Sequence, residues 1–245
     1  MDLIKSDIQQ RYDRIAEVEL RGEGAYEVVG PAKAYFRSRK LQAALELGQF
    51  PPGSHLLEIG CSVGQFTLPL TRLGYRVTGI DLSRNSVEVA KQRAQQEGLL
   101  GVSFFVDDAE SLRLFPADAF DGVVSFSTLR YLPRLDQSLK NIRRVLKAES
   151  RLVADFPNRW CPWFYLKPWV GSEPHPHDHW FTRSQLLSLL SQAGFRNGRA
   201  RGLLFTPTVA PGPWLWLFKG IDRVAEPMPG IQNLAGLWMV SAEKP

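Results

Sequence analysis

The stretch from residue 55 to residue 156 alternates short apolar segments with helical ones, and this alternation restricts the possible folds more than any other feature. Five segments have the length and composition of buried strands: His55–Gly60, Arg76–Asp81, Val102–Asp107, Phe120–Phe126 and Arg151–Phe156. Helical periodicity separates several of them, for example over Asn85–Glu97, where Ser83 can cap the helix. Strands that alternate with helices at this spacing predict a parallel sheet with helices on both faces.

The regions on either side of this core differ from it. Lys5–Glu19 and Pro31–Leu47 have apolar positions at helical spacing, and a helix at Thr182–Ala193 precedes two further strands, Arg199–Phe205 and Leu237–Glu243. All seven tryptophans follow residue 159. We therefore divide the chain into a helical lid (1–48), a core (49–200) with a long loop (158–181), and the last two strands (201–245) with an aromatic insertion (206–235).

Charge and cysteine content narrow the class of protein. The formal net charge is +5, but the basic clusters, such as Arg37–Lys40 and Arg143–Arg144, are short and scattered. A solvated basic surface therefore explains the charge better than a nucleic-acid footprint does. Two cysteines, far apart in the chain, form neither a disulfide framework nor a metal pair, and the N-terminus lacks the apolar stretch of a signal peptide. We expect a cytoplasmic protein without a nucleic-acid partner.

The loop after the first strand, LLEIGCSVGQFT, allows three interpretations. As Gly60-x-Ser62-x-Gly64 it has the spacing of a serine-hydrolase nucleophile elbow, but no oxyanion-hole loop precedes it. A dinucleotide-binding loop requires glycines where Ser62 and Gln65 stand. The third interpretation is a loop of small residues, Gly60, Cys61, Ser62 and Gly64, that encloses a nucleoside-like ligand.

Acidic residues at neighbouring strand ends favour the third interpretation. Glu58 ends the first strand, Asp81 ends the second at the position where a carboxylate accepts hydrogen bonds from a ribose, and Asp107 and Asp108 end the third. Carboxyl ends of parallel strands form the ligand-binding edge of such sheets. Carboxylates without a phosphate-binding Lys or Arg suit a ligand with a ribose and a base but no pyrophosphate, and S-adenosylmethionine is such a ligand.

Four motifs together, LEIGCSVGQFT, VTGIDLS, FFVDDAESL and FDGVVSFSTLRYL, resemble the class I S-adenosylmethionine-dependent methyltransferases, and especially the members that act on small molecules and lipid-linked acceptors. The resemblance covers about residues 45 to 200. It implies a Rossmann-like, doubly wound α/β sheet of about seven strands, mostly parallel with an antiparallel last strand. It also implies cofactor contacts from Glu58 and Gly60 to the methionine end, from Asp81 to the ribose, from Leu82, Asp108 and Ala109 to the adenine, and from Phe126 beside the methyl donor.

Two departures from the family pattern concern this site. Ser62 stands where the family most often has glycine, so its backbone must avoid a conformation reserved for glycine. Many members carry a histidine near the position of Tyr131, and here it is absent, which leaves the identity of a general base open. Arg130 could pair with an anionic acceptor or form a surface salt bridge.

The segment EPHPHDHW contains three of the four histidines, His175, His177 and His179. It is one residue short of the H-x-H-x-D-H run of binuclear metallohydrolases and follows a loop instead of a strand, so we expect no metal. One of these histidines could act as a general base, or all three could form a polar loop edge.

The aromatic segments NRWCPWFYLKPWV and PGPWLWLFKGIDRVAEPMPG leave three alternatives open. They could line an apolar pocket for the acceptor, touch a membrane surface peripherally, or cover the sheet. We expect a small, apolar or amphipathic acceptor, with a protein or RNA methyltransferase and a non-catalytic cofactor-binding module as alternatives.

Overall fold

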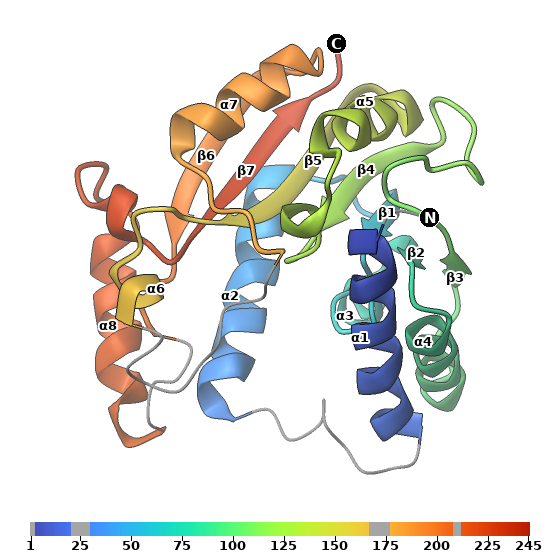
Figure 1. Cartoon of the computed structure of the whole chain (residues 1–245), viewed down its shortest axis with the longest axis horizontal. Coiled ribbons are helices and arrows are strands. Elements are labelled where there is room, and N and C mark those ends of the chain that lie inside the picture. Colours follow the sequence, from blue (N-terminus) through green and yellow to red (C-terminus); the bar gives the residue numbers. More distant parts are fainter. Residues whose placement is uncertain (1–2, 21–29, 167–176, 208–211) are drawn as a thin grey trace.

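The computed structural model describes residues 3–20, 30–166, 177–207 and 212–245. One mixed sheet of seven strands runs through it (Figure 1). The strands are β1 (His55–Ile59), β2 (Arg76–Asp81), β3 (Val102–Val106), β4 (Phe120–Ser125), β5 (Leu146–Pro157), β6 (Arg196–Leu203) and β7 (Leu237–Glu243).

The strand order is β3-β2-β1-β4-β5-β7-β6. β1 pairs in parallel with both β2 and β4, whereas β7 runs antiparallel to its neighbours β5 and β6. The predicted sheet, with its antiparallel last strand, is therefore confirmed. The order reverses between β1 and β4, and a doubly wound sheet binds its ligand beyond the carboxyl ends of the strands at such a point.

Helices cover both faces of the sheet. The described α-helices are α1 (Leu3–Leu20), α2 (Pro31–Gly48), α3 (Thr67–Arg72), α4 (Arg84–Gln96), α5 (Leu135–Val145), α6 (Pro162–Leu166), α7 (Arg183–Gln192) and α8 (Leu215–Ala225). The described residues also form three short 3-10 helices, η1 (Leu129–Tyr131), η3 (Gly212–Trp214) and η4 (Gln232–Leu234). None of the described helices is long and apolar enough to cross a membrane.

Two apolar clusters hold the helices against the sheet. On one face, Leu139 and Ile142 of α5 and Leu190 of α7 pack with strand residues such as Leu57. On the other face, Ala43 and Ala44 of α2 and Leu70 of α3 pack with residues such as Leu56 and Val124. Leu56 and Leu57, adjacent in β1, face opposite clusters because successive side chains of a strand alternate between the two faces of the sheet.

Helix caps agree with the sequence. Ser83 accepts a hydrogen bond from the Ser86 amide at the start of α4. Thr182 forms a complete capping box with Gln185 at the start of α7. Both caps satisfy amide groups that have no partner within the first turn of a helix.

Two stretches differ from the sequence-based expectation. β5 begins at Leu146, five residues earlier than predicted, because the Leu146 backbone pairs with Phe120 of β4 despite the polar residues that follow it. The insertion between β6 and β7 is partly helical, since it contains α8 between the two short helices η3 and η4. Polar residues at the start of β5 and prolines around α8 gave no pattern from which these two elements could be predicted.

Helix α1 lies across the ends of the second and third strands. Its Lys5 reaches Asp108 after β3, and its Asp13 accepts a 2.5 Å hydrogen bond from the Ser83 hydroxyl after β2. Ala16, further along the helix, packs with Val63 and Val89. These contacts place α1 over the edge of the sheet where the sequence predicts a ligand.

Candidate functional site

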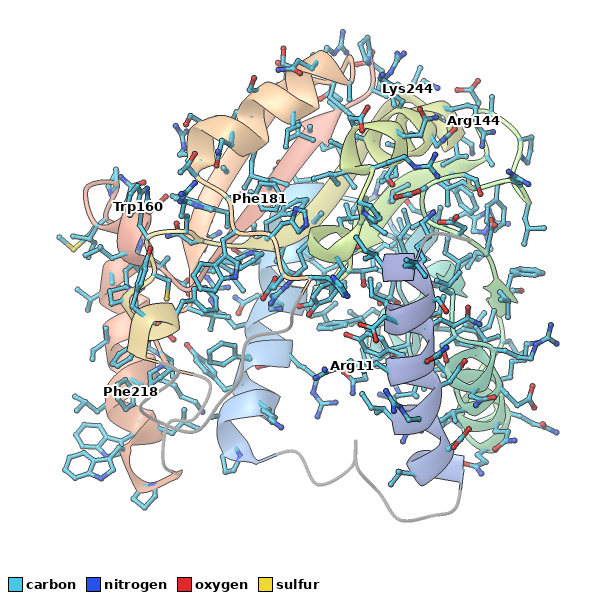
Figure 2. All side chains as sticks on the ribbon, viewed as in Figure 1. Arg11, Arg144, Trp160, Phe181, Phe218 and Lys244 are labelled. Atoms are coloured by element: carbon cyan, nitrogen blue, oxygen red, sulfur yellow. The ribbon has the colours of Figure 1, made fainter. Side chains whose placement is uncertain are left out.

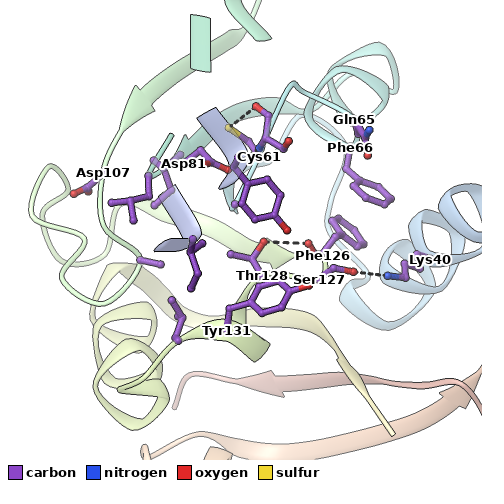
Figure 3. Close-up of a pocket in the computed structure, with 18 of the residues that line it drawn as sticks. Lys40, Cys61, Gln65, Phe66, Asp81, Asp107, Phe126, Ser127, Thr128 and Tyr131 are labelled. Atoms are coloured by element: carbon purple, nitrogen blue, oxygen red, sulfur yellow. Dashed lines mark hydrogen bonds between the residues drawn. The ribbon is translucent and has the colours of Figure 1, made fainter. Parts of the chain in front are cut away.

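A cavity of about 410 Å³ lies at the carboxyl ends of β1 to β4, between the strand ends and helices α1 and α2 (Figure 3). Ligand pockets in proteins commonly have volumes of this order. Its wall consists of Lys5, Ile8, Tyr12, Lys33, Phe36, Arg37, Lys40, Gly60, Cys61, Ser62, Gln65, Phe66, Ile80, Asp81, Leu82, Asp107, Asp108, Ala109, Phe126, Ser127, Thr128, Tyr131 and Leu132.

The glycine loop forms the floor of this cavity. The Gly60 and Cys61 amides donate hydrogen bonds to the Ile80 carbonyl, which ties the loop to β2. Gly60 has a φ of 77°, and a side chain there would place its Cβ 1.9 Å from the Thr128 hydroxyl. Only glycine therefore fits between β1 and the loop after β4.

Ser62 lies at the turn of the same loop with a φ of 47°, in the left-handed region that favours glycine. From the sequence we expected the Ser62 backbone to avoid a conformation that only glycine can adopt. Other residues can enter the left-handed region at a cost of about 1 kcal/mol. The Ser62 amide donates to Asp81, and this hydrogen bond holds the turn in place.

Asp81 connects the glycine loop with the start of α4. Its Oδ2 atom accepts a 2.9 Å hydrogen bond from the Ser62 amide, and its Oδ1 atom accepts one from the Ser83 amide. Burial raises the pKa of this carboxyl, and the hydrogen bonds from Ser83 and Ser62 offset part of that rise. Each oxygen has a further lone pair, so the carboxylate can still accept hydrogen bonds from a diol in the cavity.

Glu58 lies behind the loop and does not line the cavity. Its Oε2 atom accepts a short hydrogen bond from Thr67, while its Oε1 atom is buried without a partner. The pKa of Glu58 is raised to about 8, and burial is the largest cause. The hydrogen bond from Thr67 lowers the pKa, and the nearby Asp81 carboxylate raises it. A buried carboxyl oxygen without a partner is costly, so a ligand group or a water molecule at this point would be stabilising.

The end of β3 is joined to α1 through a lysine. The Lys5 ammonium lies 2.7 Å from Oδ2 of Asp108 and also pairs with the buried Glu110. Burial lowers the pKa of Lys5, and the two carboxylates outweigh that effect, so the pKa is raised overall. Asp107, Asp108 and the adjacent Ala109 all line the cavity.

Aromatic rings form the middle of the cavity. Phe66 and Phe126 stack with their ring centroids 3.9 Å apart (Figure 3). Tyr131, at the end of η1, hydrogen-bonds Tyr12 of α1, and burial raises its pKa so that its hydroxyl stays protonated near neutral pH. These side chains provide an apolar surface with one hydroxyl pair beside it.

Positive residues of α2 form the wall opposite the carboxylates, with Lys40 on the other side of the cavity from Asp81 and Asp107 (Figure 3). Lys40 donates to Ser127 and pairs with the buried Asp155. Arg37 and Lys33 line the same wall, about one and two helical turns before Lys40, respectively. The cavity therefore has an acidic end, an aromatic middle and a basic end.

Of the residues predicted to contact the cofactor, eight line the cavity together: Gly60, Cys61, Ser62, Asp81, Leu82, Asp108, Ala109 and Phe126. Glu58 and Gly64 do not. Gly64 has a φ of 84° and supports the loop beside Leu68 of α3. These two residues hold the loop from behind.

The predicted acceptor-side residues separate into two groups. Tyr131 lines the cavity, whereas Arg130 is held by Asp178, whose Oδ1 atom lies 2.5 Å from Nε of Arg130. His177 hydrogen-bonds Asp7 of α1, and the His179 amide donates to the Arg130 carbonyl. These three residues lie outside the cavity wall.

His175 falls outside the residues that the structure describes. Among the described residues, no three metal-binding side chains come together.

Most of the residues that α1 and α2 contribute to the cavity were not predicted from the sequence. Lys5, Phe36, Arg37 and Lys40 are far from the core motifs in the chain, and no motif marks them. The one available signal was the helical spacing of Lys33, Arg37 and Lys40, which places three cations on one side of α2.

The residues present fit a nucleoside-type methyl donor. The Ser62 hydroxyl in the cavity wall is buried and has no hydrogen-bond partner among the described residues. The Asp81 carboxylate, which accepts a hydrogen bond from the Ser62 amide, also lines the cavity. A hydroxyl and a carboxylate match the hydroxyl groups of S-adenosylmethionine.

Comparisons with known proteins identify a methyltransferase domain in the chain. Residues 57–154 match a family model described as a methyltransferase domain. The chain is 28% identical over 179 residues to a ubiquinone biosynthesis O-methyltransferase from Roseobacter denitrificans, and the match covers 69% of each protein. It is 24% identical over 221 residues to a demethylmenaquinone methyltransferase from Tropheryma whipplei, which covers 82% of this chain and 88% of that protein.

A solved structure shares the fold over nearly the whole length. The [4+2]-cyclase SpnF superposes with a TM-score of 0.70 at 21% sequence identity, covering 98% of this chain and 97% of that one. The matched methyltransferase domain, the similarity to curated methyltransferases and the strand order lead to one conclusion: this chain is an S-adenosylmethionine-dependent methyltransferase with the class I fold.

Proposed function

We propose that this enzyme transfers the methyl group to a small, apolar or amphipathic acceptor. The observation that carries this proposal is the division of the cavity into an acidic end, an aromatic middle and a basic end. The acidic end suits the donor's ribose and base, which leaves the aromatic middle and the α2 wall for the acceptor. A cavity of about 410 Å³ beneath two helices favours a small molecule over a protein or RNA substrate.

The donor supplies an activated methyl group on a sulfonium, so the protein mainly aligns the acceptor and excludes water. In our proposal, Asp81 binds the ribose, Asp108 and Ala109 bind the adenine beside Leu82, and the Gly60 backbone binds the methionine end, while Glu58 supports the loop from behind. The stacked rings of Phe66 and Phe126 exclude water from the region where the methyl group passes. An aromatic face beside a sulfonium also stabilises its positive charge.

Tyr131 is the residue that we propose to contact the acceptor. Its hydroxyl is hydrogen-bonded to Tyr12, and its raised pKa keeps it protonated near neutral pH. In our proposal it therefore orients the acceptor by donating a hydrogen bond and does not act as a general base. His177 and His179 lie outside the cavity wall, which disfavours them as bases in this arrangement. His175 stays a candidate from the sequence alone.

Lys33 and Arg37 support an amphipathic acceptor with an acidic group. Neither side chain has an ion-pair partner among the described residues, and both line the cavity. Arg130 cannot take this role while it is paired with Asp178. We therefore propose that the acceptor is a small molecule. Peripheral contact with a membrane would bring the enzyme to such an amphipathic acceptor.

Turnover of labelled donor with a panel of acceptors tests this function. The panel contains phenols, amines, carboxylated aromatics, reduced quinones, transfer RNA and a mixed protein extract. We expect product only with small molecules, and faster turnover of an acidic aromatic than of its neutral ester. Methylation of RNA or protein with no small-molecule product would overturn the proposal.

A second candidate function is use of the bound donor without methyl transfer. The fold-level similarity to a [4+2]-cyclase and the absence of a histidine near Tyr131 favour it. Donor binding without S-adenosylhomocysteine formation across the whole panel would favour this candidate over the first.

A further inference from the structure

Helix α8 presents its apolar side chains to solvent instead of to the core. Its buried residues are few: Leu215, Asp222 and Ala225. The large apolar side chains of α8 and its ends are exposed: Trp214 (57%), Trp216 (71%), Leu217 (41%), Ile221 (42%), Val224 (65%) and Met228 (48%). Single exposed apolar residues are ordinary, but a contiguous group with two tryptophans indicates a contact surface.

The acidic residues of this segment are turned inward. Asp222 accepts hydrogen bonds from the Phe205 amide and from the amide and hydroxyl of Thr206. Glu226 pairs with Arg39 and accepts a hydrogen bond from the Leu204 amide. Both carboxylates are therefore withdrawn from the exposed side of α8.

The cations of the same segment stay outside. Lys219 and Arg223 are both exposed, and the Lys219 ammonium lies 5.1 Å from the centre of the Tyr35 ring. The surface of residues 212–228 thus combines exposed tryptophan and aliphatic side chains with positive charge and no exposed negative charge. This combination suits the headgroup region of an anionic lipid surface and disfavours a neutral or basic partner.

The position of α8 connects this surface with the cavity. Leu215 of α8 packs against Ala32 of α2, and the next residue of α2, Lys33, lines the cavity. α8 also lies at the edge of the molecule, on the outer side of α2 (Figure 1), and Figure 2 shows side chains that project outward from it. α8 is therefore attached through its buried side to the helix that carries the basic end of the cavity.

We propose that α8 docks this enzyme on an anionic membrane surface, with Trp214, Trp216, Ile221 and Val224 among the headgroups and Lys219 and Arg223 against lipid phosphates. Docking in this orientation places the α2 wall beside the lipid, from which an amphipathic acceptor enters the cavity. The docking surface does not depend on the proposed methyl transfer. Only the route of the acceptor into the cavity rests on that proposed function.

Vesicle flotation of the whole protein tests the proposal. We expect binding to vesicles with one third phosphatidylglycerol, weaker binding to pure phosphatidylcholine, and loss of binding as salt is raised. Trp216→Gln with Val224→Gln should lower partitioning into the anionic vesicles at least about tenfold, because both side chains are exposed and contribute apolar area only on docking. Lys219→Gln and Arg223→Gln should each lower it by about fivefold.

Leu100→Gln is the matched control, since Leu100 is 89% exposed and lies between α4 and β3, away from α8. It should float as the wild type does, and all variants should keep the wild-type affinity for S-adenosylhomocysteine. Failure of the wild type to float on anionic vesicles, or equal flotation of the Trp216→Gln/Val224→Gln variant, overturns the proposal. So does a wild-type dimer in sedimentation that this double variant converts to a monomer, because a second copy would then cover the face.

Discussion

Lys5 in the first helix places its ammonium 2.7 Å from a carboxylate oxygen of Asp108, 103 positions further along the chain. The same ammonium pairs with Glu110, which is buried and also accepts a hydrogen bond from the Arg134 backbone. One cation thus attaches α1 to the strand end that we assign to the adenine. The helix over the cavity is fixed to the part of the site that it covers.

Replacement of Lys5 by Gln should destabilise the protein. The buried Glu110 pairs with two cations, Lys5 and the Arg134 guanidinium, and would lose the first. We expect the free energy of unfolding to fall by about 2 kcal/mol. Urea denaturation measures this change. Arg11→Gln on the same helix is the control, because Arg11 is exposed and should leave stability unaltered. Equal stability of the Lys5→Gln variant and the wild type would mean that this ion pair does not hold α1.

Arg130→Gln separates a structural role from a catalytic one. Asp178 has a side chain that is 2% exposed, and its paired cation is Arg130. Loss of one partner of a buried ion pair costs about 3 kcal/mol or more, so we expect a clear fall in stability by urea denaturation. Affinity for S-adenosylhomocysteine, measured by calorimetry below the unfolding temperature, should stay within about twofold. A stable variant with a specific loss of turnover would instead assign Arg130 to the acceptor.

The ionisation of Glu58 should make stability depend on pH. In the folded protein the pKa of Glu58 is about 8, against 4.5 for an ordinary glutamate side chain. Between these two values the folded state holds a proton that the unfolded chain has released, so the free energy of unfolding falls as pH rises through this window. Thermal unfolding at a series of pH values measures the slope.

Glu58→Gln should flatten that slope, since an amide does not titrate. The same slope in Glu58→Gln and wild type would assign the pH dependence to another group.

The central part of the sheet and most of the donor site could be predicted from the sequence, because both depend on short-range patterns. Apolar strand segments end in residues such as Asp81, and parallel strands bring their carboxyl ends to one edge of the sheet. The position of each acidic residue at a strand end was therefore enough to predict that Asp81 and Asp108 line one cavity.

The other wall of the cavity depends on contacts between distant residues, and no local pattern encodes them. Lys5 and Asp108 are 103 residues apart, and Lys40 and Asp155 are 115 apart. The same reason explains Arg130, which the sequence could assign equally to an acceptor or to a salt bridge until Asp178 was placed beside it. The buried acids of α8 were hidden similarly, since Asp222 and Glu226 have the sequence context of surface residues.

Calorimetric titration of S-adenosylhomocysteine into the wild type and Asp81→Ala tests the central claim most directly. Asp136→Ala, an exposed acid of α5, is the control, and thermal unfolding of each variant shows that it is folded. We predict micromolar binding to the wild type and to the control, and binding weaker by at least tenfold in Asp81→Ala, which corresponds to about 1.4 kcal/mol. Unchanged affinity in a folded Asp81→Ala variant would contradict the assignment of this cavity to the donor.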